Sequence, residues 1–366
     1  MASRACIVKI GGSLLVDARS YVESARNVLA LASRSGCKPI VVVSAARGVT
    51  DLLIRASEGD EAALAAAKEL YEDIARELGG TLANKVVEEL GRLAMIVRAG
   101  VRDGATRDLV LSFGERISKL LMVAALEHAG ARAVGFNADE ILITDERHGD
   151  ARVDFEMTRA LLEKAKHSLE GPDYVSVIEG FVGRARDGSV TTLGRGGSDY
   201  TATALGALLG CDVYLVTDVD GVFTADPRLV PSARLVGLMD YGEAYEAALR
   251  GAKNTNPKAF EPLLAFPGPD VYVGSWRLMG TRITGKAGEV PEGPKLLTLR
   301  GDEITVIGRG MLRSAWASKF LESLETSGAD VVEIRGGGSS LSARVRYPGE
   351  LPKLLALVHD ALLPRG

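Results

Sequence analysis

Two glycine-rich segments of this 366-residue chain contain residue types that can hold a phosphate. Residues 191–202 include Gly194-Arg195-Gly196-Gly197-Ser198-Asp199 between an apolar run and an alanine- and leucine-rich helical pattern. Residues 217–228 repeat the arrangement of an apolar run followed by glycine and acidic residues. Glycines let backbone N–H groups close on an anion, and a helix N-terminus adds about half a positive charge. The pattern predicts a site that holds phosphate beside a small charged substrate.

Two further segments add to this prediction. Lys9-Ile10-Gly11-Gly12-Ser13 ends an apolar run, and residues 43–50 follow another apolar run with Ser44, Arg47 and Thr50. Either segment alone also fits an ordinary turn between a strand and a helix. Four such segments, each placed after an apolar run, favour a shared site over four unrelated turns.

The elements that must position these residues alternate between short apolar runs and helical patterns. Most of the runs are continuously apolar, which suits strands that are covered on both faces. We therefore expect an α/β fold with a mainly parallel sheet, whose ligands bind beyond the carboxyl ends of the strands. The expected strands are 5–10, 39–43, 132–136, 175–179, 213–217 and 271–273. The expected helices are 22–33, 113–129, 156–166 and 198–209.

Two regions depart from this alternation. Residues 61–100 have helical apolar spacing on both sides of Gly79-Gly80, which predicts a helical hairpin packed over the sheet. Residues 284–294 have the glycine and proline density of a domain boundary. Beyond them, strands at 295–299, 303–307, 331–334 and 340–346 and helices at 315–327 and 352–363 predict a small α+β domain. Its exposed sheet edge would suit pairing with a second copy.

Composition excludes several classes of protein. A hydrophobic content of 46% over 366 residues supports a large core, and a net charge of −4 predicts no nucleic-acid partner. No apolar run approaches the ~20 residues that cross a bilayer, and no signal-peptide pattern begins the chain. Three scattered cysteines, Cys6, Cys37 and Cys211, predict reduced thiols in a cytoplasmic protein. Glutamine is absent, which fits either a hot-living source or biased codon usage.

With residues 112–118, 143–145, 179–183 and 251–253, the glycine segments give a resemblance to the amino-acid kinase superfamily, and within it to aspartokinases. The resemblance covers about residues 4–285, and residues 295–366 resemble an ACT regulatory module. It implies an α/β amino-acid kinase fold, with a mainly parallel sheet between helices, and a small C-terminal α+β domain. The implied domains are a catalytic domain, 1–285, and a regulatory or dimerisation domain, 295–366.

The resemblance implies transfer of a phosphoryl group from ATP, with Mg²⁺, to the side-chain carboxylate of L-aspartate, the first step toward lysine and threonine. It also implies a cytoplasmic homodimer or higher oligomer, with no membrane or nucleic-acid partner. A carboxylate with a reference pKa near ~4 is already ionised at neutral pH, so the nucleophile needs no general base. Catalysis then requires alignment and cations that neutralise charge on the phosphoryl oxygens.

The resemblance assigns roles to residues that match the family motifs. The catalytic set is Lys9, Asp199 and Lys253. The substrate-binding set is Ser44, Thr50, Glu115, Arg195 and Ser198, in which Glu115 would face an ammonium group and Arg195 would hold a carboxylate. The nucleotide-binding set is Gly11, Gly12, Ser13, Thr217, Asp218, Phe223, Asp226 and Arg228. No protein-held metal cluster is expected.

The motifs leave alternatives open. The family usually has Lys-Phe-Gly-Gly-Thr-Ser where this chain has Lys9-Ile10-Gly11-Gly12-Ser13-Leu14, and Arg47 replaces a small or apolar residue. Asn256 stands where the family usually has histidine. A related kinase for another small acid or a hydroxylated amino acid therefore remains an alternative. A non-catalytic amino-acid sensor is the other.

Overall fold

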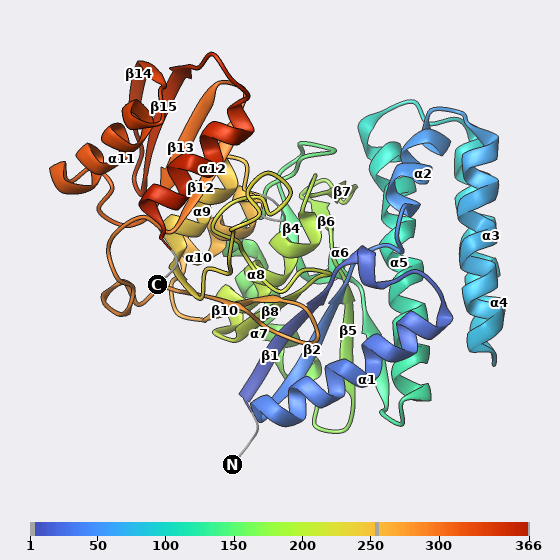
Figure 1. Ribbon diagram of the computed structural model, residues 1–366. Coiled ribbons are helices and arrows are strands. Elements are labelled where there is room, and N and C mark those ends of the chain that lie inside the picture. The colour runs from blue at the N-terminus through green and yellow to red at the C-terminus, as the bar shows by residue number, and fades with distance from the viewer. Residues whose placement is uncertain (1–3, 253–255, 365–366) are drawn as a thin grey trace. The chain divides into compact units, whose positions relative to one another are not determined.

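The computed structural model describes residues 4–252 and 256–364. The chain divides into two compact units, Met1–Asp218 and Val219–Gly366, which are described separately below (Figure 1).

The first unit is built on parallel strands in the order β3-β5-β2-β1-β8. Every residue of β5 is buried, as are the last five residues of β2, which are all apolar, as expected of a sheet that is covered on both faces. These strands are β1 (Arg4–Ile10), β2 (Cys37–Val43), β3 (Ala133–Phe136), β5 (Val175–Glu179) and β8 (Asp212–Val216). A second sheet has the order β4-β6-β7, formed by β4 (Ile143–Thr144), β6 (Val182–Ala185) and β7 (Val190–Thr192). The expected mainly parallel α/β architecture is confirmed.

Helices cover both faces of the parallel sheet. Helices α1 and α5 pack on β2, while α8 packs on β1 and β8 with α7 against it (Figure 1). Their bounds are α1 (Ala18–Ser35), α5 (Gly104–His128), α7 (Phe155–Leu169) and α8 (Gly197–Leu209), with the short helices η1 (Gly12–Leu14), α2 (Val49–Ser57) and α6 (Ala138–Ile141) between them. Helix α5 starts nine residues before the expected position. The Asp103 side chain caps it by accepting a 2.7 Å hydrogen bond from the Thr106 N–H group.

The predicted helical hairpin consists of α3 (Glu61–Leu78) and α4 (Leu82–Ala99). It packs on α2 and α5, and α5 lies between it and the strands (Figure 1). The hairpin therefore forms an extra layer beyond the helices, and the expectation that it packs over the sheet is wrong. Its apolar face packs against other helices. The spacing of apolar residues shows that a helix has a buried face, but it does not show whether that face packs on a helix or on a sheet.

The second unit contains a three-strand segment followed by an antiparallel four-stranded sheet. The first has β9 (Leu238–Asp240), β10 (Val271–Gly274) and β11 (Thr281–Thr284), with α9 (Tyr241–Leu249), η2 (Pro257–Phe260) and α10 (Glu261–Ala265). After η3 (Ala287–Glu289), the second sheet has the order β12-β13-β15-β14. Its elements are β12 (Leu296–Arg300), β13 (Glu303–Ile307), α11 (Ser314–Thr326), β14 (Asp330–Gly336), β15 (Ser340–Arg346) and α12 (Leu351–Leu362). The predicted C-terminal α+β pattern is confirmed.

The core of this C-terminal pattern extends into earlier residues. Ala225 and Val230 belong to the same buried cluster as Phe320 and Leu354. The backbone of β12 also joins in, because the Leu297 N–H group donates to the Thr224 carbonyl oxygen at 2.8 Å. Packing therefore links the C-terminal sheet to residues around 224–234, upstream of the glycine- and proline-rich segment.

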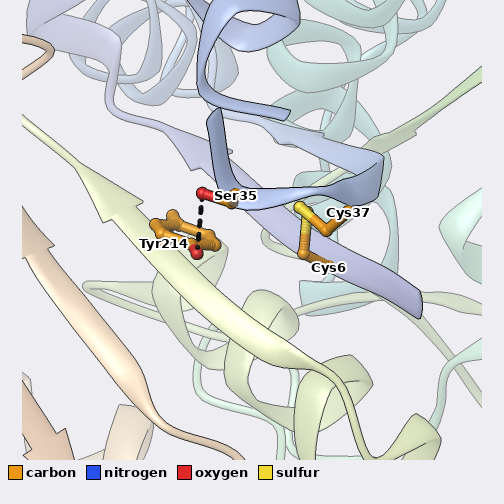
Figure 2. The surroundings of a disulfide bond; sticks show 4 residues. All are labelled: Cys6, Ser35, Cys37 and Tyr214. Atoms are coloured by element: carbon orange, nitrogen blue, oxygen red, sulfur yellow. Dashed lines mark hydrogen bonds between the residues drawn. A yellow bond between two sulfur atoms is a disulfide. The ribbon is translucent and has the colours of Figure 1, made fainter. Parts of the chain in front are cut away.

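The three cysteines do not all remain reduced. Cys6 on β1 and Cys37 on β2 form a disulfide with a Cα–Cα distance of 5.8 Å (Figure 2). The expectation of three reduced thiols is wrong because the parallel register pairs Cys6 with Pro39 and Arg4 with Cys37, which brings cysteines 31 residues apart onto neighbouring strands. Nearby, the Tyr214 hydroxyl donates to Ser35 Oγ at 3.1 Å (Figure 2). Cys211 is free and buried, and burial raises its pKa to about 11.

Within residues 4–252 and 256–364, no helix is both long enough and apolar enough to cross a membrane. The longest, α5, has 25 residues, and charged side chains such as Asp108, Glu115 and Lys119 interrupt its apolar sequence.

Candidate active site

The first unit has a cavity of about 570 Å³ at the carboxyl ends of β1, β2 and β5 and the N-terminal end of α8. Nine of the predicted site residues line it: Lys9, Gly12, Ser13, Ser44, Thr50, Glu115, Arg195, Ser198 and Asp199. These residues come from four separate segments of the sequence, 9–13, 44–50, 115 and 195–199. Their convergence follows from the parallel topology, which places the ends of neighbouring strands at the same edge.

A salt bridge between Lys9 and Asp199 crosses the cavity wall. Lys9 Nζ lies 2.7 Å from Asp199 Oδ1, and the two side chains are 12% and 22% exposed. Lys9 stands one residue before the end of β1, and Asp199 lies in the first turn of α8. The cap of α8 is Gly196, so Asp199 is available as the partner of a lysine instead of serving as the cap. The salt bridge holds the Lys9 ammonium group at the N-terminal end of α8, a position where binding of an anion is favoured.

Glycines allow the backbone to approach closely at two points of the cavity wall. A Cβ atom on Gly12 would lie 2.6 Å from the Ala45 carbonyl oxygen, a distance that backbone cannot accommodate. Gly194 has φ of +77°, and a Cβ there would meet Asp150 Oδ1 at 2.5 Å. Gly12 is therefore required by the close approach of the neighbouring backbone, and Gly194 by its positive φ and by its contact with Asp150. Both requirements hold in addition to any role in binding phosphate.

The remaining predicted substrate residues lie around this wall. Ser44 follows β2, and its N–H group donates to the Ile10 carbonyl oxygen at 3.2 Å, which joins the ends of two strands. Thr50 lies in the first turn of α2 and Ser198 in the first turn of α8. Arg195 is exposed at the cavity, directly before the Gly196 cap. Arg47 also lines the cavity and is exposed, so its charge is available to an anionic ligand.

Glu115 is the buried acid of the cavity. Its residue is 3% exposed, and Oε1 accepts a hydrogen bond from the Ala45 N–H group at 3.2 Å. Oε2 is buried with no hydrogen-bond partner. Burial, with a smaller contribution from the charge of Glu179, raises the pKa of Glu115 to about 8. An unpartnered carboxylate oxygen facing a cavity suits a ligand that brings its own cation and hydrogen-bond donors.

Two residues that matter to the cavity are not among the predicted site residues: Asp108, which contacts residues of its wall, and Phe181, which lines it. Asp108 on α5 is 1% exposed and accepts hydrogen bonds from the Gly149 N–H, the Thr192 N–H and the Thr192 hydroxyl at 2.7–2.9 Å. It therefore fixes the strand that leads to Gly194. Phe181 lines the cavity with φ of +67°, the positive φ of a non-glycine residue that often marks a functional site. Asp108 belongs to no sequence motif that would mark it as a site residue. The positive φ of Phe181 cannot be predicted from its being a phenylalanine.

The other predicted residues do not line this cavity. Gly11 is buried beside it, with its N–H group donating to the Val216 carbonyl oxygen at 3.0 Å. Thr217 and Asp218 follow β8 and are bonded to each other, Thr217 Oγ1 donating to Asp218 Oδ1 at 3.0 Å. Phe223, Asp226 and Arg228 belong to the second unit, where an Asp226–Arg228 salt bridge closes a turn at 2.9 Å. Lys253 lies outside the described residues.

The arrangement suits transfer of a phosphoryl group to an acceptor that is already charged. The cavity contains cations, backbone donors at glycines and a buried acid, and none of its lining residues is a histidine or cysteine. In the part of the chain that the structure describes, no group of three or more histidine, cysteine, aspartate or glutamate side chains is placed to hold a metal ion. The cations, backbone donors and buried acid of the cavity can act on a ligand by position and charge.

Comparisons with known proteins agree with this chemistry. The model of the amino acid kinase family matches residues 4–274. Lysine-sensitive aspartokinase 3 of Escherichia coli K12 is 34% identical over 334 residues, which cover 85% of this chain and 71% of that protein. An aspartokinase of Corynebacterium efficiens is 40% identical over 197 residues, 52% of this chain. That match spans 45% of the Corynebacterium protein, so this chain covers under half of that relative.

A solved structure gives the same result for the fold. E. coli aspartokinase III, in complex with aspartate and ADP in its R-state, has a TM-score of 0.75 and 27% identity to this chain. The similarity covers 98% of this chain and 84% of the E. coli chain.

Proposed function

The chain belongs to the amino acid kinase family and, within it, to the aspartokinases, and on this premise we propose that it transfers the γ-phosphoryl group of ATP to the side-chain carboxylate of L-aspartate. The products are 4-phospho-L-aspartate and ADP. One observation carries the proposal: Lys9, Asp199, Arg195 and Glu115 line a single cavity at one edge of the parallel sheet. The complex of the E. coli relative with aspartate and ADP supports the same pair of ligands.

The geometry accounts for both ends of the amino acid. The guanidinium group of Arg195 can hold the α-carboxylate through two parallel hydrogen bonds, while Glu115 faces the ammonium group. Hydroxyl groups of Ser44, Thr50 and Ser198 complete the polar surroundings. These contacts leave the side-chain carboxylate directed at the phosphate, and its oxygen attacks phosphorus as the bond to the leaving ADP oxygen breaks.

Charge stabilisation falls to Lys9 in this proposal. Its ammonium group, oriented by Asp199, would neutralise charge on the transferring phosphoryl oxygens. Gly11, Gly12 and Ser13 would supply backbone and hydroxyl donors, and Lys253 a second cation. Mg²⁺ usually binds through one or two carboxylates together with substrate phosphates. Asp199 at the cavity suits that donor set, and the metal would shield the charge of the phosphates.

Nucleotide recognition is proposed for the segment that begins after β8. Thr217, Asp218, Phe223, Asp226 and Arg228 are the candidates. Phe223 is half-buried and offers an apolar surface for a base, while the Asp226–Arg228 pair holds the turn that follows it.

The remaining proposals concern organisation. We propose a catalytic domain at 1–285 and an ACT-like domain at 295–366 that regulates the enzyme or joins it into a homodimer or higher oligomer. The edge strand β14, with Val332 and Ile334 41% and 49% exposed, supports pairing with a second copy. Relatives named aspartokinase support a place in lysine and threonine biosynthesis. We also propose a cytoplasmic location, where ATP and free amino acids are both available.

A hydroxamate assay tests the reaction. Only a carboxylate acceptor forms an acyl phosphate that hydroxylamine traps, so aspartate, glutamate and homoserine are compared with ATP and Mg²⁺. We expect product with aspartate and a loss of about 10³-fold in kcat for Lys9→Ala, because a preorganised cation at the phosphoryl group is worth several kcal/mol. Lys353→Ala, at a lysine whose side chain is 73% exposed, is the control.

Each other outcome points elsewhere. Product with glutamate alone, or phosphorylation of homoserine without hydroxamate, would indicate a kinase for a different substrate. Aspartate binding without ADP release from any acceptor would indicate a sensor. Full activity of Lys9→Ala would remove Lys9 from the mechanism.

A further inference from the structure

Glu115 is buried in the cavity without a counter-ion. It is 3% exposed, its Oε1 is bonded to the Ala45 N–H group, and its Oε2 has no hydrogen-bond partner. No lysine, arginine or histidine nitrogen of the described residues lies within 4.0 Å of its carboxylate. A lone carboxylate in such a place is costly in its ionised form, because burial removes the water that stabilises its charge.

The lysine one turn along the same helix does not supply the missing charge. Lys119 Nζ lies 2.7 Å from Glu179 Oε2 and donates to Asn137 Oδ1 at 2.5 Å and to the Phe136 carbonyl oxygen at 3.3 Å. The Lys119 ammonium group is therefore held by one ion pair, with Glu179, and by two hydrogen-bond acceptors. Glu179 is itself fully buried at the end of β5, and its charge adds to the cost of ionising Glu115.

The other groups around Glu115 also leave it unneutralised. On α1, the Tyr21 hydroxyl is bonded to Ser118 Oγ at 2.7 Å, and on α3 the Tyr71 hydroxyl donates to the Gly114 carbonyl oxygen at 2.6 Å. The cavity also contains the charged side chains Lys9, Arg47, Asp51, Arg107, Arg195 and Asp199. Lys9 pairs with Asp199 at 2.7 Å, and Arg107 lies 3.8 Å from Glu58.

We propose that Glu115 carries a proton while the site is free of amino acid, and that the ammonium group of the substrate expels this proton to solvent when it binds beside the carboxylate. The inference rests on the proposed function, in which Glu115 faces that ammonium group. The O–H bond of the Glu115 carboxyl group breaks, the proton passes to water or buffer, and the substrate keeps its own ammonium protons. The buried site thus avoids an unpaired charge in both its free and its bound states.

The direction of the pKa shift agrees with this geometry. Burial raises the pKa of Glu115 to about 8, so the carboxyl group is mostly protonated at pH 7. Substrate binding then releases most of one proton at pH 7 and little at pH 9. Because only the ionised form pairs with the ammonium group, affinity for aspartate should fall about tenfold from pH 7 to pH 6, where free aspartate itself does not titrate.

Isothermal titration calorimetry measures the released proton directly. Aspartate is titrated into the full chain with saturating ADP and Mg²⁺, at pH 7, in phosphate and in Tris. These buffers differ in ionisation enthalpy, so the observed heats differ in proportion to the number of protons released. We expect close to one proton per aspartate bound at pH 7 and a near loss of the buffer dependence at pH 9.

Two variants separate Glu115 from other sources of protons. Glu115→Gln keeps an acceptor for the Ala45 N–H group and lacks the titrating group, so we expect weaker binding with no proton release. Glu179→Gln frees Lys119, which lies four residues from Glu115 on one helix face and can then neutralise it. We expect that variant to bind aspartate with less than half of the wild-type proton release. Glu350→Gln, at a carboxylate whose side chain is 71% exposed, is the matched control and should release as many protons as the wild type.

The possible failures are distinguishable. Aspartate that binds and is phosphorylated with buffer-independent heats would overturn the inference and leave the proposed function intact. Unchanged proton release in Glu115→Gln would assign the proton to another group and also overturn it. Absence of both aspartate binding and hydroxamate formation would remove the proposed function instead.

Discussion

Glu115 in the first unit and Glu243 in the second are both helical glutamates that folding removes from water. Glu115 is 3% exposed and Glu243 is fully buried, and burial raises the pKa of each. They differ in their partners. One oxygen of Glu115 has no hydrogen-bond partner, whereas both oxygens of Glu243 are bonded.

Glu243 is enclosed by groups that match its charge. Its Oε1 accepts the Arg309 N–H group at 2.7 Å and forms a salt bridge with Lys295 Nζ, and its Oε2 accepts the Asp240 N–H group at 2.9 Å. The Asp240 side chain in turn accepts the Glu243 N–H group, which completes a capping box at the start of α9. One side chain therefore joins α9 to the open end of the β12–β13 hairpin, where β12 begins and β13 ends.

The difference teaches how to assign roles to buried acids. A buried carboxylate with all of its partners supplied by the chain has a structural role. One that lacks a counter-ion and faces a cavity is incomplete until a ligand arrives, which is the pattern expected of a functional site. Its cost to stability in the free protein is offset when the substrate binds.

The largest expected effect comes from removing the partner of Glu243. Lys295→Met leaves a fully buried carboxylate without its cation, so we expect a loss of about 3–5 kcal/mol in the free energy of unfolding. Urea denaturation followed by circular dichroism measures it. The double variant Glu243→Gln/Lys295→Met should be less destabilised than Lys295→Met, since glutamine carries no charge. Equal losses in the two would mean that Glu243 is not ionised in the folded protein.

A smaller loss is expected at Asp108, which lies in the same unit as Glu115 and has all of its partners. Asp108→Asn keeps the shape of the side chain. It weakens the hydrogen bonds that the Asp108 carboxylate accepts in the wild type, because asparagine carries no charge. We expect a loss of about 2 kcal/mol in the free energy of unfolding. The KM for aspartate should also rise, because Thr192 leads to the Arg195 loop. A variant as stable as the wild type would contradict a structural role for this carboxylate.

The last expected effect has the opposite sign. Glu115→Gln should be more stable than the wild type at pH 8.5 and much closer to it at pH 5, measured as thermal and urea unfolding without ligand. The folded-state pKa of Glu115 is raised from 4.5 to about 8, so the wild type loses stability as pH rises through that window. Glutamine does not titrate and avoids this loss. A variant less stable than the wild type at pH 8.5 would show that Glu115 already has a hidden partner.

Much of the fold was predictable because local pattern and final environment agree. Continuous apolar runs such as residues 39–43 predicted strands buried on both faces, and the glycine before Ser198 correctly placed the start of α8. The long α5 was only half predicted, because the charged residues Arg107 and Asp108 break the apolar pattern that marks its C-terminal part. Tertiary contacts pair those charges, which periodicity does not reveal.

Residue types and spacing by themselves predicted a phosphate site where glycines and cations follow the strands of a parallel sheet, because such segments meet at one edge of the sheet. The family resemblance added further residues, Glu115 among them, and nine of the predicted residues line one cavity. Three-dimensional packing alone decided the rest. It paired Cys6 with Cys37, tied Asp108 to the strand that leads to Gly194, and left Glu115 without a counter-ion while Lys119 was taken by Glu179. Disulfide, hydrogen-bond and ion-pair partners depend on which segments fold side by side. The residue type of a buried charged side chain does not tell which groups will surround it.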